Sequence, residues 1–180
     1  MSGIRSDRRR RVFEPLVLSY PVSCNNEALR RRGMNQLLFL DFDGVLHTLN
    51  GRRFELLPVL AAWLQERPDI GLVVSSSTRV QNGVELLREA LGELRSRVVG
   101  ATPVLNRAPL DGPIRAVRQR EIETWLAAAA GQRPAAYAAL DDDATLYEKS
   151  WPPLVLCNSR TGLRIEHLAA IDQALSTQHI

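Results

Sequence analysis

Two aspartates stand one residue apart at the end of an apolar run in "LLFLDFDGVLH", residues 37 to 47. Asp41 and Asp43 are followed at once by Gly44. Two more polar groups follow apolar runs in the same way, "SSSTR" at 75 to 79 and "DDD" at 141 to 143. If those runs are neighbouring strands, several carboxylates converge, and like charges that close raise one another's pKa or require a cation. A hard cation with oxygen ligands, most naturally Mg²⁺, resolves the conflict.

Each of these motifs also has a structural interpretation when taken alone. Aspartate and glycine are ordinary turn residues, hydroxyl side chains suit the entry to a helix, and a run of aspartates is often a solvated loop. The three motifs occur in this order, each directly after an apolar run. That combination favours a functional site.

The elements that would position these residues alternate along the chain. Near-continuous apolar runs suit strands buried on both faces of a parallel sheet, and they predict strands at 36–41, 70–76, 97–100, 135–141 and 154–157. Helical spacing of apolar residues predicts helices at 54–66, 83–91, 115–130 and 164–176. Pro58 suits the first turns of its helix, and Gly92 and Gly131 suit helix ends. We therefore expect a three-layer α/β/α sandwich with a mostly parallel, Rossmann-like sheet, whose ligand site lies beyond the carboxyl ends of the strands.

The charge of the chain is concentrated near its beginning. The net charge is +3, but residues 1–33 carry eight arginines against three acids and so contribute +5, which leaves −2 for the remainder. This pattern predicts a basic, disordered or loosely attached extension at 1–33 and one domain at 34–180; an arm for nucleic acid or an export signal are the other interpretations of it. Met34 is a possible alternative start.

Two further features bear on location. No apolar run approaches the roughly 18 residues of a membrane-spanning helix, so no membrane association is expected. The two cysteines, Cys24 and Cys157, are far apart and lack metal-ligand spacing. Reduced thiols and a cytoplasmic location are the default for such a chain. The sequence leaves the oligomeric state open.

The chain resembles the haloacid dehalogenase-like (HAD) superfamily of phosphoryl-transfer hydrolases, with "LLFLDFDGVL" as the first motif. More narrowly, "LFLDFDGVLH", "VVSSSTR", "RVVGATP", "REIETWL", "ALDDD" and "LVLCNSRTGL" are similar to the small HAD-like domain of Swiss-army-knife RNA-repair proteins. The resemblance extends over about residues 36 to 176.

This resemblance implies a role for each motif. Asp41 would be the nucleophile that forms an aspartyl-phosphate, and Asp43 the general acid and base. Mg²⁺ would bind the Asp41 carboxylate, the Asp43 backbone carbonyl and the fourth motif, Asp141 and Asp142, with Asp143 as a less certain helper. Ser76, or Ser75 if the register differs by one, would donate to a phosphoryl oxygen, and the first and second motifs would add substrate contacts through Gly44, Ser77 and Arg79.

The third motif requires a basic residue near the start of the helix before the fourth strand. Arg115, Arg118 and Arg120 are available there, and we favour Arg118; the alternative for each is a solvated helix charge. For Arg79 the alternative is an exposed arginine at a helix start. His47 could touch substrate, although a loop histidine without a partner is the simpler interpretation. Trp63 and Trp125 fall on apolar helix faces and should be core, and Trp151 should pack at a strand entry.

The spacing of the motifs leaves no room for a cap domain. About 30 residues separate Asp43 from Ser75, and a helix occupies much of that stretch. An open, capless site favours a phosphate on a macromolecule or on an RNA or DNA end. The sequence thus predicts a Mg²⁺-dependent phosphatase. Two alternatives remain, a non-catalytic regulatory or nucleic-acid-binding module and a phospho-receiver domain, and the second of these lacks the aspartate that it needs after the third strand.

Overall fold

A parallel sheet of five strands forms the centre of the computed structural model, which describes residues 17–18, 29, 32–105, 114–129 and 134–177. The strand order is β4-β3-β2-β6-β7, and every neighbouring pair is parallel. The bounds are β2 (Gln36–Leu40), β3 (Ile70–Val74), β4 (Val98–Ala101), β6 (Ala136–Asp141) and β7 (Leu154–Leu156). Each predicted strand is therefore present, within a few residues at its ends.

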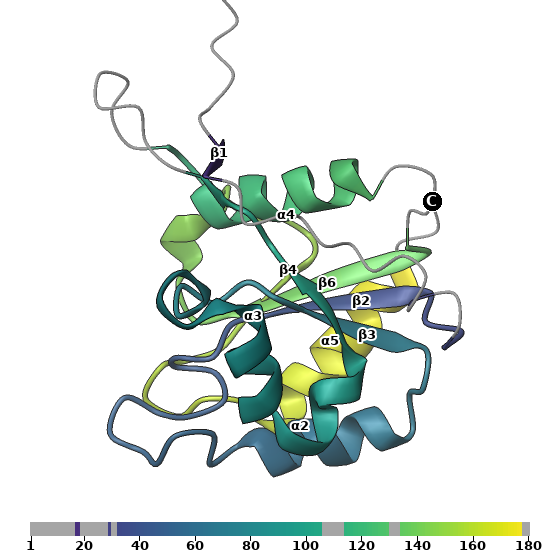
Figure 1. Cartoon of the computed structure of the whole chain (residues 1–180). Coiled ribbons are helices and arrows are strands. Elements are labelled where there is room, and N and C mark those ends of the chain that lie inside the picture. The colour runs from purple at the N-terminus through teal and green to yellow at the C-terminus, as the bar shows by residue number, and fades with distance from the viewer. Residues whose placement is uncertain (1–16, 19–28, 30–31, 106–113, 130–133, 178–180) are drawn as a thin grey trace, which may run out of the picture.

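Helices cover both faces of this sheet (Figure 1). Helix α4 (Val117–Ala128) lies on one face, and α2 (Leu57–Gln65), α3 (Arg79–Ala90) and α5 (Ile165–Thr177) lie on the other. The side chains of β2 alternate between the two layers: Leu38 and Leu40 pack with α2 and α5, whereas Leu37 and Phe39 pack with α4. Burial on both faces explains why the strands are continuous apolar runs, and the predicted α/β/α sandwich is confirmed.

The helix bounds differ from the predicted ones where local geometry intervenes. Helix α2 begins at Leu57 with Pro58 in its first turn, as expected, but three residues after the predicted start. Helix α3 begins at Arg79, before the predicted start, and is kinked at Gly83, whose φ is 69°. Glycine adopts that conformation without steric cost, and the apolar periodicity resumes only after it. Gly92, with φ of 54°, follows α3 as predicted, whereas Gly131 lies outside the described residues.

A second, two-stranded sheet was not predicted. Strands β1 (Val17–Leu18) and β5 (Val104–Leu105) pair antiparallel, and strands of two residues leave no periodicity in the sequence. Leu29 is also buried, against the side of the sheet that α4 covers. Most of the extension at 1–33, including Cys24, lies outside the described residues, so its attachment and the boundary at residue 34 stay predictions.

No cap domain interrupts the described residues. Between Asp43 and Ser75 the chain forms only α2 and β3, and between Arg79 and Arg118 it forms α3, η1 (Gly92–Arg97), β4 and β5, apart from 106–113, which the structure does not describe. Trp63 and Trp125 are buried, and Trp151 stacks on Tyr147 just before β7, as the sequence predicts.

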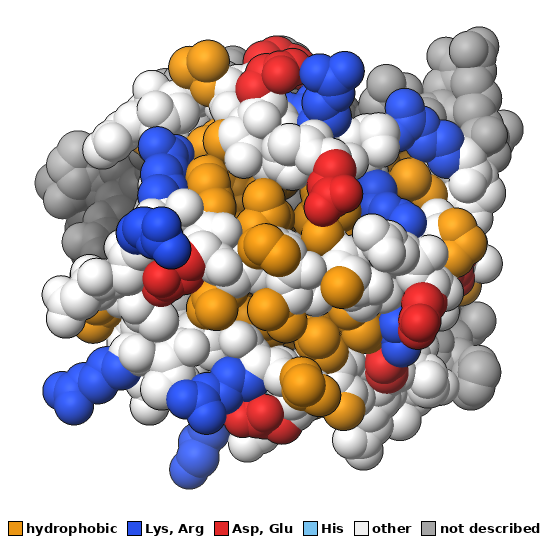
Figure 2. Space-filling view, turned by 90° about the horizontal axis from the view of Figure 1, so that it is seen from below, with side chains coloured by type: hydrophobic (Ala, Val, Ile, Leu, Met, Phe, Trp, Pro, Cys, Tyr) orange, Lys and Arg blue, Asp and Glu red, His pale blue; other side chains and the backbone are white. Residues whose placement is uncertain are grey.

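The outer surface is mixed in character. Figure 2 shows hydrophobic side chains gathered at the middle of the lower face, with Lys and Arg side chains around them. Among the described helices, none combines the length and the hydropathy that crossing a bilayer requires.

Candidate active site

The carboxyl ends of three central strands bring the first, second and fourth motifs together. Leu40 of β2 is in register with Val74 of β3 and with Leu140 of β6. The backbone N–H of Asp41 donates to the Leu140 carbonyl at 3.0 Å, and that of Ser75 donates to the Leu40 carbonyl at 3.0 Å. Asp41 therefore lies between Ser75 and Asp141, as the motif order predicts.

Three carboxylates form a cluster at this edge. Asp41, Asp141 and Asp142 each offer an oxygen, and these oxygens lie within 4.8 Å of one another. Asp41 is 5% and Asp141 1% exposed. Asp43 does not belong to the cluster, because its side chain is 58% exposed and faces His47. Such a group of oxygen ligands could hold a metal ion, and hard cations such as Mg²⁺ match it.

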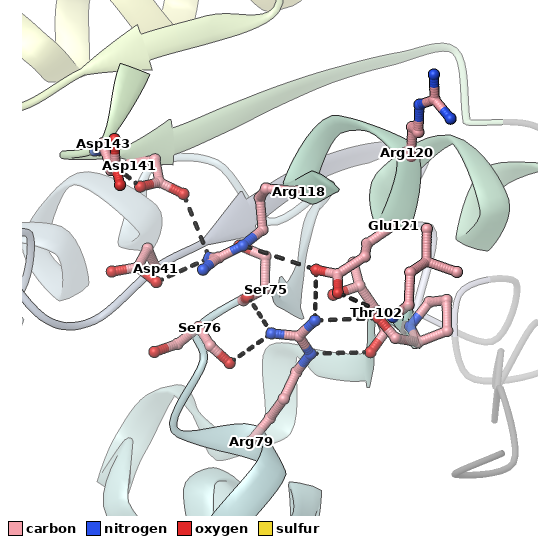
Figure 3. A network of polar contacts seen from close by, with 12 residues as sticks. Asp41, Ser75, Ser76, Arg79, Thr102, Arg118, Arg120, Glu121, Asp141 and Asp143 are labelled. Carbon is pink, nitrogen blue, oxygen red and sulfur yellow. Dashed lines mark hydrogen bonds and ion pairs between the residues drawn. The ribbon is translucent and has the colours of Figure 1, made fainter. Parts of the chain in front are cut away.

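The guanidinium of Arg118, from α4, forms ion pairs with two carboxylates of the cluster. Its Nη1 donates to Asp41 Oδ1 at 2.8 Å and lies 3.3 Å from Asp141 Oδ2 (Figure 3). Arg118 is buried, whereas Arg115 and Arg120 are exposed and Arg120 points away from the site. Burial opposes the charge of Arg118, but Asp141 and Asp41 outweigh it and raise the pKa of the guanidinium. Among the three candidate arginines, the geometry thus selects Arg118.

The electrostatics of Asp41 reflect both its burial and its partner. Burial raises the pKa of the Asp41 carboxyl to about 6 against the lowering effect of Arg118, and the neighbouring Asp141 adds to the rise. Burial and Asp141 also raise the pKa of Asp142. One arginine does not neutralise three clustered carboxylates, and a cation bound to them would favour their charged forms.

The acids of the fourth motif differ in what they bind. Asp141 Oδ1 accepts from the backbone N–H groups of Asp142 and Asp143, and Asp141 Oδ2 accepts from the Tyr147 hydroxyl at 2.8 Å. Asp143 caps the short helix η2 (Ala144–Leu146) by accepting from Thr145, so its proposed help at the site is not supported by its position. In contrast, Asp41 Oδ2 and the Asp142 carboxylate accept no hydrogen bond from another described residue.

Gly44 makes room for Asp142. Its φ is +72°, and a Cβ at this position would overlap the Asp142 carboxylate. The glycine of the first motif is therefore required twice, for its backbone conformation and for the close approach of Asp142. Because residue 44 has no Cβ, the Asp142 carboxylate can occupy that space and complete the cluster.

The second motif offers two buried serines. Because Ser75 follows β3 in register with Asp41 after β2, the two side chains lie on the same side of the sheet. Ser75 Oγ is buried and has no hydrogen-bond partner within the described structure. Ser76 Oγ instead accepts from the Thr78 hydroxyl at 3.0 Å. Ser77 is exposed. Ser75, the second choice from sequence, thus has the better geometry for donating to a ligand.

The surroundings of Arg79 differ from both interpretations made from the sequence, a substrate contact and an exposed arginine at a helix start. The residue is 5% exposed, so it is not an exposed helix-start arginine. Its guanidinium donates to the backbone carbonyls of Ser75, Ser76, Thr102 and Pro103 and to Glu121 Oε2 (Figure 3). All five N–H groups of a guanidinium can be satisfied in this way. Arg79 holds the second-motif loop and is not free to contact a substrate.

His47 is the other correction. The sequence favoured a loop histidine without a partner, but His47 Nε2 lies 3.0 Å from Asp43 Oδ1. The i to i+4 spacing from Asp43 to His47 is present in the sequence, but such spacing indicates a contact only within a helix, and these residues form a loop. His47 also packs edge-on against Phe54.

Sequence reasoning missed two further residues that hold the site. Tyr147 anchors Asp141 from the loop after β6, six residues along the chain, where no pattern points to it. Glu121 lies between Arg79 and Arg118, at 3.7 Å from Arg118 Nε. The i to i+3 spacing of Arg118 and Glu121 in "RQRE" places them on one helix face. This spacing is the feature of the sequence that indicates their contact.

A three-layer α/β/α fold with D-x-D-G after its central strand, and an acidic pair after the neighbouring strand, is the arrangement of HAD-like hydrolase domains. The model of the family described as the HAD domain in Swiss Army Knife RNA repair proteins matches residues 37–168, which is more than half of the chain, and the chain belongs to this family. No curated protein and no solved structure matches the chain significantly.

Proposed function

We propose that the protein is a Mg²⁺-dependent phosphohydrolase that acts through an aspartyl-phosphate on Asp41. The observation that carries the proposal is the buried Asp41 carboxylate, which is clustered with Asp141 and Asp142 and paired with Arg118. A perturbed carboxyl at the carboxyl edge of a parallel sheet is a strong candidate for a nucleophile. Family membership supports hydrolase chemistry.

The charge balance of the buried network supports a divalent cation. Four carboxylates, those of Asp41, Asp141, Asp142 and Glu121, face two guanidiniums, those of Arg79 and Arg118. Two negative charges are left over, in a group of which only Asp142 is half-buried and the others are buried, and an uncompensated buried charge is costly. Asp41 Oδ2 and the Asp142 carboxylate would hold the ion, with the backbone carbonyl of Asp43 as a further oxygen ligand. When bound, Mg²⁺ would neutralise charge on the phosphoryl oxygens.

The protein side chains would divide the reaction into two displacements. Asp41 attacks phosphorus and forms the acyl-phosphate bond as the bond from phosphorus to the leaving oxygen breaks. Asp43, exposed at the mouth, gives its proton to that oxygen. It then takes a proton from the water that attacks phosphorus, which releases inorganic phosphate and restores Asp41. Ser75 Oγ and Arg118 would donate to the phosphoryl oxygens.

The substrate we propose is a phosphate on a polynucleotide end, of RNA or DNA. The described residues contain no cap over the site, so a large phosphorylated group could approach it. The family is described by its occurrence in RNA repair proteins, which supports the same class of substrate. We also propose a cytoplasmic location, because Cys157 forms no disulfide within the described residues and reduced thiols are typical of that compartment.

Hydrolysis of a generic aryl phosphate tests the proposal. Wild type should release phosphate only with Mg²⁺, and Asp41→Asn, which keeps the shape but removes the nucleophile, should lose at least about a thousandfold in rate. Ser75→Ala should cost more than Ser76→Ala. Mg²⁺ binding without any phosphate release, on aryl phosphate or on phosphorylated oligonucleotides, would instead favour a binding module.

A further inference from the structure

A cavity of about 350 Å³ opens beside Asp43 and is separate from the carboxylate cluster. Its lining includes Asp43, His47, Arg53, Phe54, Thr78 and Asn82. The volume lies in the range of sites for small organic groups. Asp43 is the residue that the cavity shares with the proposed reaction, in which it protonates the leaving group. The cavity therefore lies where the leaving group of the substrate would be.

Aromatic and cationic groups form one wall of this cavity. Phe54 is held edge-on by Phe42, at 5.4 Å between ring centroids, and by His47, at 5.8 Å. The Arg53 guanidinium lies 5.0 Å from the Phe54 ring centroid and is exposed. Phe54 also has a φ of 60°, a left-handed conformation that is uncommon for a residue with a side chain. Backbone strain of this kind is concentrated at functional sites.

Polar groups are also available to a bound ring. Thr78 and Asn82 lie on the wall formed by α3 and the residue before it, and the Asn82 amide donates to the Thr78 carbonyl at 3.0 Å. A flat face and a guanidinium beside polar side chains are the features that bind heteroaromatic rings.

We infer that this cavity binds the nucleobase of a nucleotide whose phosphate lies at Asp41, with Phe54 and Arg53 as the residues that determine specificity. Phe54 and the guanidinium of Arg53 offer stacking surfaces, and the lining side chains of Thr78 and Asn82 are the polar groups near the edge of a bound base. A lipid or a plain sugar phosphate would not use the planar surfaces. This inference rests on the proposed phosphohydrolase function and names its substrate class, a terminal nucleotide.

Matched pairs of phosphate esters test the inference. Adenosine 3′- and 5′-monophosphates are compared with the corresponding abasic ribose phosphates, which carry the same ester without the base. Wild type should prefer at least one nucleotide over its abasic partner by about tenfold in kcat/KM, the scale of one stacked base. Phe54→Leu and Arg53→Gln should abolish most of that preference, which is read within each variant as the ratio of kcat/KM for the nucleotide to kcat/KM for its abasic partner. Arg52→Gln, beside the cavity but not lining it, is the control and should keep the preference.

The outcomes separate the two proposals. Equal kcat/KM for both members of each pair, or a preference that survives in both variants, would overturn the base site while the phosphohydrolase stands. If neither these esters nor phosphorylated oligonucleotides are hydrolysed in Mg²⁺, the proposed function fails, and the cavity is judged by equilibrium binding of adenosine, which has no phosphate. Binding that weakens about fivefold or more in Phe54→Leu supports the site. No binding to wild type, or the same Kd in both variants, overturns it.

Discussion

At the scale of single residues, the site depends on a buried carboxyl whose charge is only partly compensated. Asp41 is 5% exposed, and its carboxylate lies next to Arg118 and to the carboxylates of Asp141 and Asp142. A nucleophile needs its charged form, and burial works against that form. The position of Asp142, which Gly44 permits, adds a second carboxylate for a cation. Charge on Asp41 and cation binding are therefore linked.

The first prediction concerns how stability depends on pH without metal. The pKa of Asp41 is raised from its ordinary value of 3.8 to about 6 in the folded chain. Between these values the folded chain keeps the proton that the unfolded chain has released, so stability from this group is present at low pH and lost as pH rises towards about 6. The loss is on the order of 3 kcal/mol.

Urea unfolding in a chelator at pH 4.5 and pH 7.5 measures this effect. The difference between wild type and Asp41→Asn removes the titrations that the two chains share and leaves that of Asp41 together with its coupling to Asp141 and Asp142. Wild type should lose stability relative to Asp41→Asn between the two pH values, and Mg²⁺ should restore it at pH 7.5. A difference that is flat, or that changes in favour of wild type as pH rises, would show that Asp41 is not held as described.

The second prediction concerns Gly44→Ala. The added Cβ would overlap the Asp142 carboxylate and would strain a backbone with φ of +72°. Asp142 should be displaced from the cluster, so Mg²⁺ affinity measured by calorimetry should fall about tenfold or more, the size of effect seen when groups around a metal are disturbed. Gly33→Ala is the matched control, since Gly33 has a φ of +65° but no atom near its missing Cβ. Equal Mg²⁺ affinity in both variants would contradict the proposed role of Asp142.

At the scale of elements, one buried network joins the helices on opposite faces of the sheet. Arg79 at the start of α3 and Arg118 in the first turn of α4 both meet Glu121 of α4. Arg79 binds the carbonyls of the second motif, and Arg118 binds Asp41. Because the network passes beyond the sheet edge where the strands end, it fixes the two helices and the site together.

The third prediction follows from this network. Arg79→Lys replaces a planar fork of five donors by one ammonium, which cannot reach four carbonyls and Glu121 at once. Leaving several of these buried carbonyls without a donor should cost at least about 2 kcal/mol in the free energy of unfolding, measured with urea. Arg95→Gln is the control, because the Arg95–Glu89 pair is exposed and should change stability by less than about 1 kcal/mol. A loss of under about 1 kcal/mol in Arg79→Lys would contradict the structural role.

The same scale explains what the sequence could predict. Strands β2, β3 and β6 are continuous apolar runs because both faces are buried. The motifs lie at the ends of these runs, so the sheet and the acidic cluster could be predicted from the sequence. The burial of Arg79 could not be predicted from the sequence, because the carbonyls that it binds follow β3 and β4 and come together only in the folded chain. Similarly, the pairing of His47 with Asp43 depends on a loop conformation that no periodicity encodes.

At the scale of the whole molecule, the domain is expected to be independent of most of the preceding extension. The fourth prediction is that residues 34–180 fold and keep Mg²⁺-dependent hydrolysis. The shortened chain should lose about 1 to 3 kcal/mol in the free energy of unfolding, because it lacks the buried Leu29 side chain and strand β1, which pairs with β5. Leu29→Ala in the full chain is the matched variant and should show the part of this loss that the Leu29 side chain contributes. An unfolded 34–180 chain would place the domain boundary before residue 34.

The most direct test of the central claim is to trap the covalent intermediate. Protein mixed with excess substrate and Mg²⁺ is quenched in acid, and borohydride then reduces an aspartyl-phosphate to homoserine, which mass spectrometry locates in the sequence. The account predicts homoserine at position 41, absent from Asp41→Asn. With an aryl phosphate, whose leaving group needs no proton from Asp43, homoserine should increase in Asp43→Asn, where attack by water is slowed. Phosphate release with no modified residue at 41 would mean that water attacks the substrate directly, and it would contradict the assignment of Asp41 as the nucleophile.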